Sequence, residues 1–570
     1  MTKKPVLFFL VFLALLFLIF RNLILNLSTN LPDWLDYALM VWIVFQNTSK
    51  IISLNFSNFF DTNAFYPHQN TLFFSDTLIP QSLIFLPFQL LTGNLILSFN
   101  IVFLLTFVLN YISAFLLWKQ IFKDNLTAFI GSLLIVFSPF FHLEFAHFQS
   151  LSFWPFLFSF YFIFKNEQTK NAKDLSFAGV FLAIQFLAGA YLAIFLVLTI
   201  IIFYLIKFLT GEKLAPLLKK GLIIFGVFII ADGIFIKGYI DTQRAYEIKR
   251  DIREYITYSA HLSDYVFTTK INSSLYQLPI LEKWNQFDKN HLDGKAAFPG
   301  FLLTGAALAG LFTLAKRKGK ILLAITLDKQ KAFFISLVII GFLFSLGPRL
   351  NFNGNYAHIP LPYNFVLKTT PFIEAVRVPS RWSFIFYFAL VYFGLTYLKK
   401  LNLSQPKPIL FGVISILLLF EYVPLNFSTH YEQYINEKYT MLKNICSVKK
   451  QALLEIPITH LDVAQGIGEG VNYISKVQLS STYHGCNLIN GYSGYDLPAI
   501  FNLRDKLYRA IENYDTNTFI AELKKNQVNI LKINQEFLIK ELRQPSINFF
   551  ENLKNNKEIE TLNNSVFRIK

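Results

Sequence analysis

The sequence predicts a mainly α-helical, polytopic membrane protein with a small α/β domain at its C-terminal end. Of the 570 residues, 54% are hydrophobic and 17% are aromatic, whereas 15% are charged. Soluble domains carry about 25% charged residues, and disordered chains combine low hydrophobicity with high charge. Long apolar runs recur along the chain, and a helix needs about 20 such residues to cross a bilayer. The composition therefore excludes an ordinary soluble protein and a disordered one.

The positive charge of the chain follows the pattern of membrane proteins. The formal net charge is +16, a value that would usually suggest nucleic-acid binding. Here the basic residues lie in short clusters between apolar runs, as they do in cytoplasmic loops. We therefore expect the lipid bilayer, and no nucleic acid, as a partner. The clusters are Lys119/Lys123, Lys165/Lys170/Lys173, Lys207/Lys213/Lys219/Lys220, Lys316/Arg317/Lys318/Lys320 with Lys329/Lys331, and Lys399/Lys400.

About eleven transmembrane helices follow if every basic cluster is cytoplasmic. The first, Val6–Leu27, lacks the small-residue cleavage site of a signal peptide, so we expect an uncleaved span with a cytoplasmic N-terminus. The run Leu78–Leu91 is too short to cross and contains two prolines, so we expect it along the membrane interface. The other spans are Leu95–Trp118, one helix pair in Leu126–Phe164, one pair in Leu175–Tyr204, and single helices beginning near Gly221, Phe298, Ala332, Trp382 and Ile409.

An odd number of spans places the C-terminus outside the cell. We expect residues 1–427 to form the transmembrane domain of a multi-pass cell-membrane protein, with external loops at residues 28–77 and 237–297. Residues 428–570 have a length typical of one domain. They alternate strand-like runs (452–458, 528–533 and 565–569) with helical runs (499–513 and 518–525), which predicts an extracytoplasmic α/β domain. Its two cysteines, Cys446 and Cys486, form either a disulfide or a pair of buried free thiols.

The first external loop carries two acidic residues suited to chemistry. In Pro32-Asp33-Trp34-Leu35-Asp36, the carboxylates would lie on one face of a helical turn. Such a pair can deprotonate an acceptor hydroxyl or hold a divalent cation. The alternative is that Asp33 caps a helix that runs through residues 38–45. Asp76, near the end of the same loop, also fits a helix cap by its spacing.

Two further groups of polar residues lie at predicted external turns. His142, Glu144 and His147, with Gln149, offer ligand-like spacing, and the alternatives are a metal site or a hydrated polar turn. Arg377 and Arg381 lie just before a predicted span, on its external side, where positive charge is disfavoured. An arginine fork at this depth suits a lipid-linked phosphate, and the alternative is contact with anionic lipid.

These motifs, taken in order, resemble the poorly characterised bacterial membrane proteins of the GT-C type of glycosyltransferase. The resemblance runs from about Leu27 to Lys570. The early motifs are Pro32-Asp33-x-x-Asp36-x-Ala38-Leu39-x-x-Trp42, Tyr66-Pro67 with Ser75-Asp76, Asn100, and Phe137-Ser138-Pro139 with His142, His147 and Gln149. The later ones are Arg377-Val378-Pro379-Ser380-Arg381, Leu454-Glu455-Ile456-Pro457, Asn490-Gly491-Tyr492-Ser493-Gly494, Val528-Asn529-Ile530-Leu531 and Ser565-Val566-Phe567-Arg568.

The resemblance implies that a sugar is transferred from a polyprenyl-phosphate donor to a glycan, lipid or protein acceptor of the cell envelope. Asp33 or Asp36, with a preference for Asp33, matches the catalytic base of an inverting displacement. Arg377 and Arg381 would bind the donor phosphate. Further polar positions around the substrate cavity are Asp76, His142, His147 and Gln149. This chemistry needs no organic cofactor, and we expect no metal. The alternative is a divalent ion, Mg²⁺ or Mn²⁺, bound by the carboxylates.

Two other functions fit the sequence. The first is a transporter or flippase of a lipid-linked saccharide, but transporters place ionisable residues at the bilayer midplane, and the spans here are nearly uncharged apart from Asp232 near a span end. The second is a non-catalytic envelope assembly protein that binds a partner through its tail. The concentration of polar residues outside the spans favours the transferase.

Overall fold

The computed structural model is mostly helical and forms two compact units. The first unit comprises Met1–Asn26, Val102–Ile236 and Lys249–Ser428, and the second comprises Leu27–Ile101, Lys237–Ile248 and Thr429–Lys570. The structure describes residues 3–33, 35–267, 275, 278–281, 297–316, 328–352, 355–370, 373–400, 407–422, 430–431, 439–458, 467–495, 497–534 and 545–570. Part of the predicted external loop 237–297 lies outside these residues, as do Arg317, Lys318 and Lys320 of one basic cluster.

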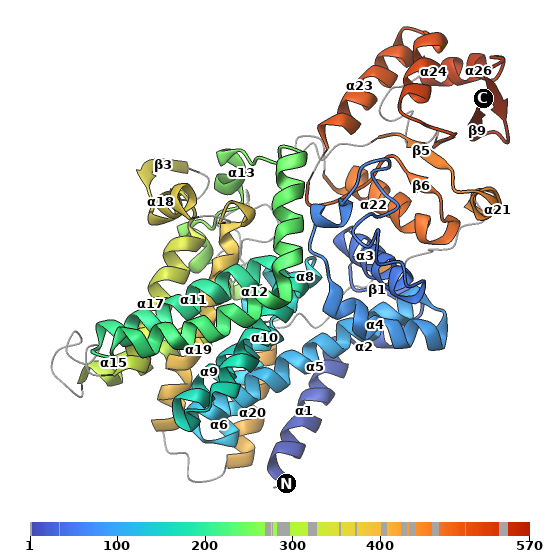
Figure 1. Ribbon diagram of the computed structural model, residues 1–570. Coiled ribbons are helices and arrows are strands. Elements are labelled where there is room, and N and C mark those ends of the chain that lie inside the picture. The colour runs from blue at the N-terminus through green and yellow to red at the C-terminus, as the bar shows by residue number, and fades with distance from the viewer. Residues whose placement is uncertain are drawn as a thin grey trace. The chain divides into compact units, whose positions relative to one another are not determined.

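The first unit is a bundle of helices. Helices α15 and α17 pack against α19, helices α9 and α11 pack against α10, and α6 contacts α1, α19 and α20 (Figure 1). The α-helices are α1 (Lys3–Ile19), α2 (Arg21–Ile24), α5 (Leu95–Phe122), α6 (Asn125–Val136), α7 (Pro139–Leu143), α8 (Phe148–Leu151), α9 (Trp154–Thr169), α10 (Ala172–Ala188), α11 (Ala190–Leu209), α12 (Leu214–Ala245), α13 (Ile252–Thr257), α15 (Phe301–Lys316), α17 (Lys329–Ser345), α18 (Pro362–Thr369), α19 (Ser383–Lys400) and α20 (Lys407–Tyr422). The unit also contains the 3-10 helices η2 (Leu262–Tyr265), η5 (Pro279–Leu281), η6 (Ile373–Ala375) and η7 (Pro379–Trp382), and the hairpin β2 (Arg349–Phe352) and β3 (Asn355–Pro360). Helices α5 and α12 contribute residues to both units.

The starts of several helices in the first unit follow from single polar residues. Asp124 caps α6 by accepting a hydrogen bond from the backbone N–H of Thr127 at 2.7 Å. Asn171 caps α10 in the same way, and Asp328 caps α17. Such caps satisfy backbone donors that have no partner in the first turn of a helix. The predicted helix pair in Leu175–Tyr204 is confirmed, because α10 ends and α11 begins at Gly189.

Five helical stretches of the described residues are long and apolar enough to cross a membrane. They are Leu95–Phe122, Asn125–Leu143, Ala190–Leu209, Leu214–Ala245 and Pro379–Lys400. Three shorter apolar helices cover Lys4–Ile19, Ile79–Thr92 and Phe301–Phe312. These stretches support a membrane protein, while the count of eleven spans stays a prediction.

The second unit combines the first loop with the tail of the chain. Its helices are α3 (Leu35–Ile52), η1 (Thr71–Phe74), α4 (Ile79–Thr92), α21 (Thr440–Val448), α22 (Ile467–His484), α23 (Pro498–Glu512), α24 (Thr516–Lys525) and α26 (Pro545–Leu553). Its strands are β1 (Asn30–Leu31), β4 (His430–Tyr431), β5 (Ala452–Ile456), β6 (Asn487–Leu488), β7 (Ile530–Ile533), β8 (Ile559–Thr561) and β9 (Val566–Ile569). Helix α3 packs against α22 and α4, as Figure 1 shows for α22.

A five-stranded sheet in the order β6-β5-β7-β9-β8 forms the core of the tail. Strand β5 is parallel to β6 and β7, and β9 is antiparallel to β7 and β8. The three strand-like runs predicted in the tail contain β5, β7 and β9, and the two helical runs correspond to α23 and α24. A disulfide joins Cys446 in α21 to Cys486 just before β6, which decides between the two alternatives for these cysteines.

A buried ion pair lies between the two central strands of this sheet. Glu455 on β5 and Lys532 on β7 are register partners, and their side chains form a salt bridge. The hydroxyl of Tyr473 donates to Glu455 Oε1 at 2.9 Å, and the hydroxyl of Tyr439 donates to the same oxygen at 3.2 Å. Because a buried charge is costly unless it is paired and hydrogen-bonded, these contacts explain how the sheet tolerates both charges.

His484 lies beside this pair and makes the tail sensitive to acid. Its Nδ1 accepts a hydrogen bond from the backbone N–H of Cys486 at 3.1 Å, and its ring stacks on Tyr439. Burial, aided by the charges of Lys532 and Lys450, lowers the pKa of His484 to about 3. The ring is therefore neutral in the folded tail, whereas in the unfolded chain it takes up a proton below about pH 6.5.

We therefore expect the tail to lose stability as the pH falls from about 6.5 towards 3, because the unfolded state binds the proton more tightly. The loss from this residue at pH 5 is about 2 kcal/mol. Amide hydrogen exchange of β5 and β7 in the full-length protein measures it. In His484→Asn, which keeps an acceptor for the Cys486 N–H, the pH dependence should shrink by that amount. An equally steep loss in wild type and variant would contradict the assignment.

Candidate functional site

Six residues of the first unit form what we call the arginine cluster. They are Glu144, His147, Tyr191, Tyr258, Arg377 and Arg381. Glu144 and His147 lie in the turn between α7 and α8, Tyr191 lies in the first turn of α11, and Tyr258 follows α13. Arg377 lies between η6 and η7, and Arg381 lies within η7. The cluster thus combines residues from four separate parts of the chain.

Arg381 is held in a buried ion pair with Glu144. Its Nε lies 2.8 Å from Glu144 Oε2, and the two side chains are 7% and 2% exposed. The guanidinium also lies over the ring of Tyr191, with Cζ 4.8 Å from the ring centroid. The carboxylate neutralises the charge of Arg381, and the contacts on both sides give its guanidinium one orientation.

Arg377 is in a different electrostatic position. Its guanidinium lies over the ring of Tyr258, with Cζ 5.2 Å from the centroid, and its backbone N–H donates to the Tyr191 hydroxyl at 3.2 Å. The side chain is half-buried. Among the described residues no carboxylate lies within salt-bridge distance of it, and its buried Nε makes no hydrogen bond with them. Arg377 is therefore the member of the cluster best placed to bind an anion.

His147 lies between these charges. Its Nδ1 is 3.6 Å from Glu144 Oε2. Burial of the ring, together with the positive charges of Arg381 and Arg377, holds the pKa of His147 well below its usual value. The imidazole is consequently neutral at physiological pH, so it can donate or accept a hydrogen bond without adding charge.

The other two residues predicted near His147 have structural neighbours of their own. The ring of His142 contacts the backbone carbonyl of Tyr422 at the end of α20. Gln149 is buried in α8, and a Cβ at Gly189 would lie 2.8 Å from its backbone oxygen, so the turn between α10 and α11 requires glycine there. In the described part of the chain, no group of three His, Cys, Asp or Glu residues is arranged to hold a metal ion.

The acidic residues of the first loop lie in the second unit, in what we call the acidic cluster: Asp33, Asp36, Tyr37 and Tyr492. Helix α3 begins at Leu35, so Asp36 lies in its first turn and Asp33 lies before it. Asp36 Oδ1 accepts a hydrogen bond from the Tyr492 hydroxyl at 2.6 Å. Burial, together with the negative charges of Asp33 and Asp36, raises the pKa of Tyr37 well above its usual value. Both carboxylates therefore act electrostatically on the Tyr37 phenol.

The chain that leads to Asp33 is held from two sides. The side-chain amide of Asn100 on α5 donates to the carbonyl oxygens of Leu27 at 2.8 Å and Asn30 at 2.7 Å. Asn30 and Leu31 then pair with β4 as an antiparallel strand. Asn100, which the sequence identified only through the resemblance, is therefore a residue that positions the acidic loop.

Asp76 lies just before α4 and does not cap it. Helix α4 begins at Ile79, and its N-cap position is Leu78, whose backbone is left-handed (φ 51°) and whose side chain makes no cap hydrogen bond. The interpretation of Asp76 as the N-cap residue is therefore wrong, because the left-handed Leu78 occupies that position. The neighbouring carbonyl of Ser75 accepts a hydrogen bond from the Tyr239 hydroxyl at 2.8 Å.

The sequence interpretation missed the four tyrosines of these clusters as site residues. Tyr37, Tyr191 and Tyr258 carry no motif, and Tyr492 was noted only as part of a glycine-rich turn. Glu144, by contrast, had a usable signal: a carboxylate within an apolar stretch must have a partner. Arg381, equally out of place, was the natural candidate.

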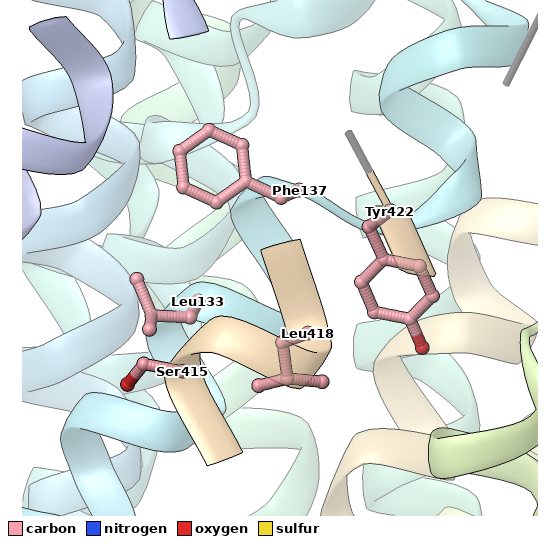
Figure 2. Close-up of a pocket in the computed structure, with 5 residues that line it drawn as sticks. All are labelled: Leu133, Phe137, Ser415, Leu418 and Tyr422. Atoms are coloured by element: carbon pink, nitrogen blue, oxygen red, sulfur yellow. The ribbon is translucent and has the colours of Figure 1, made fainter. Parts of the chain in front are cut away.

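A small hollow in the first unit has an uncharged lining, unlike the arginine cluster. Figure 2 shows Leu133 and Phe137, from α6 and its C-terminal end, near Ser415, Leu418 and Tyr422 of α20. These five residues line it and none is charged. The hollow therefore offers nothing to neutralise a phosphate.

Comparison with known proteins relates the chain to one family and one type of fold. The family model described as a domain of unknown function (DUF6311) matches residues 4–423. No curated protein matches the chain. Among solved structures, the arabinofuranosyltransferase AftD from mycobacteria has a similar fold, with a TM-score of 0.55 and 11% sequence identity. The similarity covers 94% of this chain and 35% of AftD, so the chain spans about a third of AftD's length.

Two structures of the oligosaccharyltransferase from Archaeoglobus fulgidus are more distant. For the apo form the TM-score is 0.46, and the similarity covers 93% of this chain and 69% of the oligosaccharyltransferase chain. For the form tethered to an acceptor peptide the TM-score is 0.47, and the similarity covers 96% of this chain and 72% of the oligosaccharyltransferase chain. Both are 11% identical to this chain. The likeness to AftD confirms the GT-C-like, mostly helical fold predicted from the sequence.

Proposed function

The chain belongs to the DUF6311 family, and we propose that it is a membrane glycosyltransferase of the GT-C type. It transfers a sugar from a polyprenyl-phosphate donor to an acceptor of the cell envelope on the outer face of the membrane. The observation that carries this proposal is Arg377, a half-buried arginine that forms no salt bridge with the described residues, beside a second arginine that Glu144 neutralises. The AftD-like fold supports it at the level of architecture.

The charge of the arginine cluster suits the proposed donor. A polyprenyl-phosphate sugar is a phosphodiester with one negative charge. Arg381 is balanced by Glu144, and His147 is neutral. Glu254 acts on Arg377 electrostatically but forms its salt bridge with Arg250, so we assign the charge of Arg377 to the phosphate. Because the lipid phosphate is the leaving group, a cation held beside it stabilises the charge that develops as the sugar departs.

The acidic cluster supplies the proposed base. A carboxylate removes the proton from the acceptor hydroxyl as its oxygen attacks the anomeric carbon, and the bond from that carbon to the phosphate oxygen breaks. Direct displacement inverts the anomeric centre. Asp33 and Asp36 are the candidates, and the start of α3 favours their negative charge because the N-terminal end of a helix dipole is positive. We propose no metal or organic cofactor for this step.

The proposed topology puts this chemistry outside the cell. It has about eleven spans, a cytoplasmic N-terminus, a transmembrane domain over residues 1–427 and an extracytoplasmic domain over residues 428–570. The disulfide between Cys446 and Cys486 supports the external location of the tail, because disulfides persist in oxidising compartments. The tail would then select or cover the acceptor.

Transfer of labelled sugar from synthetic polyprenyl-phosphate sugars in proteoliposomes tests the proposal. We expect transfer by the wild type and a loss of about 100-fold in kcat/KM in Arg377→Ala, comparable to the removal of one charge-stabilising donor. Arg377→Lys should keep part of the activity because it keeps the charge. Arg253→Ala is a matched control, since this exposed arginine pairs with the neighbouring Asp251.

Two outcomes would contradict the proposal. One is an unchanged rate in Arg377→Ala. The other is wild-type protein that moves lipid-linked saccharide across the bilayer but transfers no sugar, which would favour a flippase.

A further inference from the structure

We infer that Tyr492, in the turn Asn490–Tyr495 of the tail, is a positioning residue that fixes Asp36 as an oriented carboxylate. The inference rests on the proposed function and deepens it, because it gives one of the two acids a defined orientation. It also assigns the tail a part in the reaction step. The contact that carries it joins residues separated by 456 positions in the sequence.

The hydrogen bond itself has the geometry of a charge-assisted one. The Tyr492 hydroxyl lies 2.6 Å from Asp36 Oδ1, within the range of O–H···O⁻ hydrogen bonds. A phenol that donates to one oxygen favours the ionised form of the carboxylate and fixes its plane. An acid held in this way is a poor proton acceptor in the reaction and a good group for orienting a hydroxyl. Asp33 precedes the same helix, and both acids act electrostatically on Tyr37.

The turn that presents Tyr492 is fixed by three contacts. The backbone N–H of Tyr492 donates to Oε1 of the buried Gln478 on α22 at 2.5 Å. The side-chain amide of Asn490 donates to the backbone oxygen of Glu455 on β5 at 2.8 Å. A Cβ at Gly491 would lie 2.8 Å from the ring of Phe65, so only glycine lets the turn approach the first loop this closely.

The helix that carries Gln478 is tied to the helix that carries Asp36. The indole N–H of Trp42 on α3 lies 3.0 Å from Asn63 Oδ1 and 3.1 Å from Ser481 Oγ on α22. The backbone of the first loop also bonds to β6, through Leu488 N to Asn63 O at 2.6 Å and Tyr66 N to Leu488 O at 2.8 Å. The donor and the acceptor of the Tyr492–Asp36 hydrogen bond therefore belong to one hydrogen-bonded framework.

Tyr492→Phe tests the inference, because it removes only the hydroxyl. We expect kcat to fall about tenfold with little change in KM for the donor. The acid limb of the pH–rate profile should move up by about one pH unit, as expected when a carboxylate loses one strong hydrogen bond. In an Asp36→Ala background, which removes the acceptor, the same change should have little further effect. Tyr495→Phe is the matched control, since it removes a hydroxyl from the same turn that donates to the Tyr246 backbone oxygen at 3.4 Å.

A second measurement does not depend on activity. Infrared difference titration, with Asp36→Asn as the reference, identifies the carboxylate band of Asp36 in wild type and in Tyr492→Phe. A shift of the band's titration midpoint to higher pH in Tyr492→Phe supports the inference even if the wild type transfers no sugar, an outcome that would contradict only the proposed function. An unchanged midpoint, or an equal loss of activity in Tyr492→Phe and Tyr495→Phe without a shift of the acid limb, would overturn it.

Discussion

Asp33→Asn is expected to lower the rate of sugar transfer by about 10²–10⁴-fold, the usual contribution of a general base. The amide has nearly the same shape as the carboxylate but cannot accept the proton of the acceptor hydroxyl. Asp33 lies before the first turn of α3, so the change leaves the helix intact. Folding should therefore be preserved, and the loss should appear in kcat rather than in the KM for the donor.

Single-turnover transfer in proteoliposomes measures this effect. Asp61→Asn in the same loop is the matched control: Asp61 Oδ1 accepts a hydrogen bond from the backbone N–H of Asn70 at 2.7 Å, and an asparagine keeps that acceptor. Asp36→Asn should also reduce activity, but less, because the asparagine oxygen can still accept from Tyr492. Full activity in Asp33→Asn, with activity abolished in Asp36→Asn, would reverse the assignment of the two acids.

Glu144→Gln is expected to destabilise the first unit by about 3–5 kcal/mol, the cost of leaving one partner of a buried ion pair uncompensated. Glu144 and Arg381 are almost completely buried, so water cannot replace the lost carboxylate. The neighbouring His147 cannot supply a negative charge, and Arg377 adds a like charge nearby. Unfolding of the detergent-solubilised protein, followed by denaturant titration, measures the change.

The control for this variant is a pair of the same chemistry on the surface. Glu560 and Arg568 form a salt bridge with both side chains more than 40% exposed, and such pairs contribute about 0–1 kcal/mol. Glu560→Gln should therefore have little effect. Replacing both buried partners, in Glu144→Leu with Arg381→Met, should recover most of the lost stability, because an apolar pair of similar volume avoids the buried charge. A loss below 1 kcal/mol in Glu144→Gln would show that water reaches the pair.

Much of the local structure could be predicted from the sequence. The helix pair around Gly189 and the strands β5, β7 and β9 follow from hydrophobic periodicity, which depends on residues a few positions apart. The prediction that Asp76 caps a helix failed, because cap spacing does not reveal a left-handed turn at Leu78. The resemblance drew attention to the right segments but not to the partners of their side chains.

The sequence by itself determined the membrane class, the helical segments, the α/β character of the tail and the short list of charged residues in unusual places. These properties depend on composition and on near neighbours. Only the tertiary structure decided that Arg381 forms a buried ion pair with Glu144, whereas Arg377 forms no salt bridge with the described residues, and that Tyr492 of the tail donates to Asp36 of the first loop. Such contacts join residues far apart in the chain, so their geometry depends on how whole helices and strands pack, which no local pattern encodes.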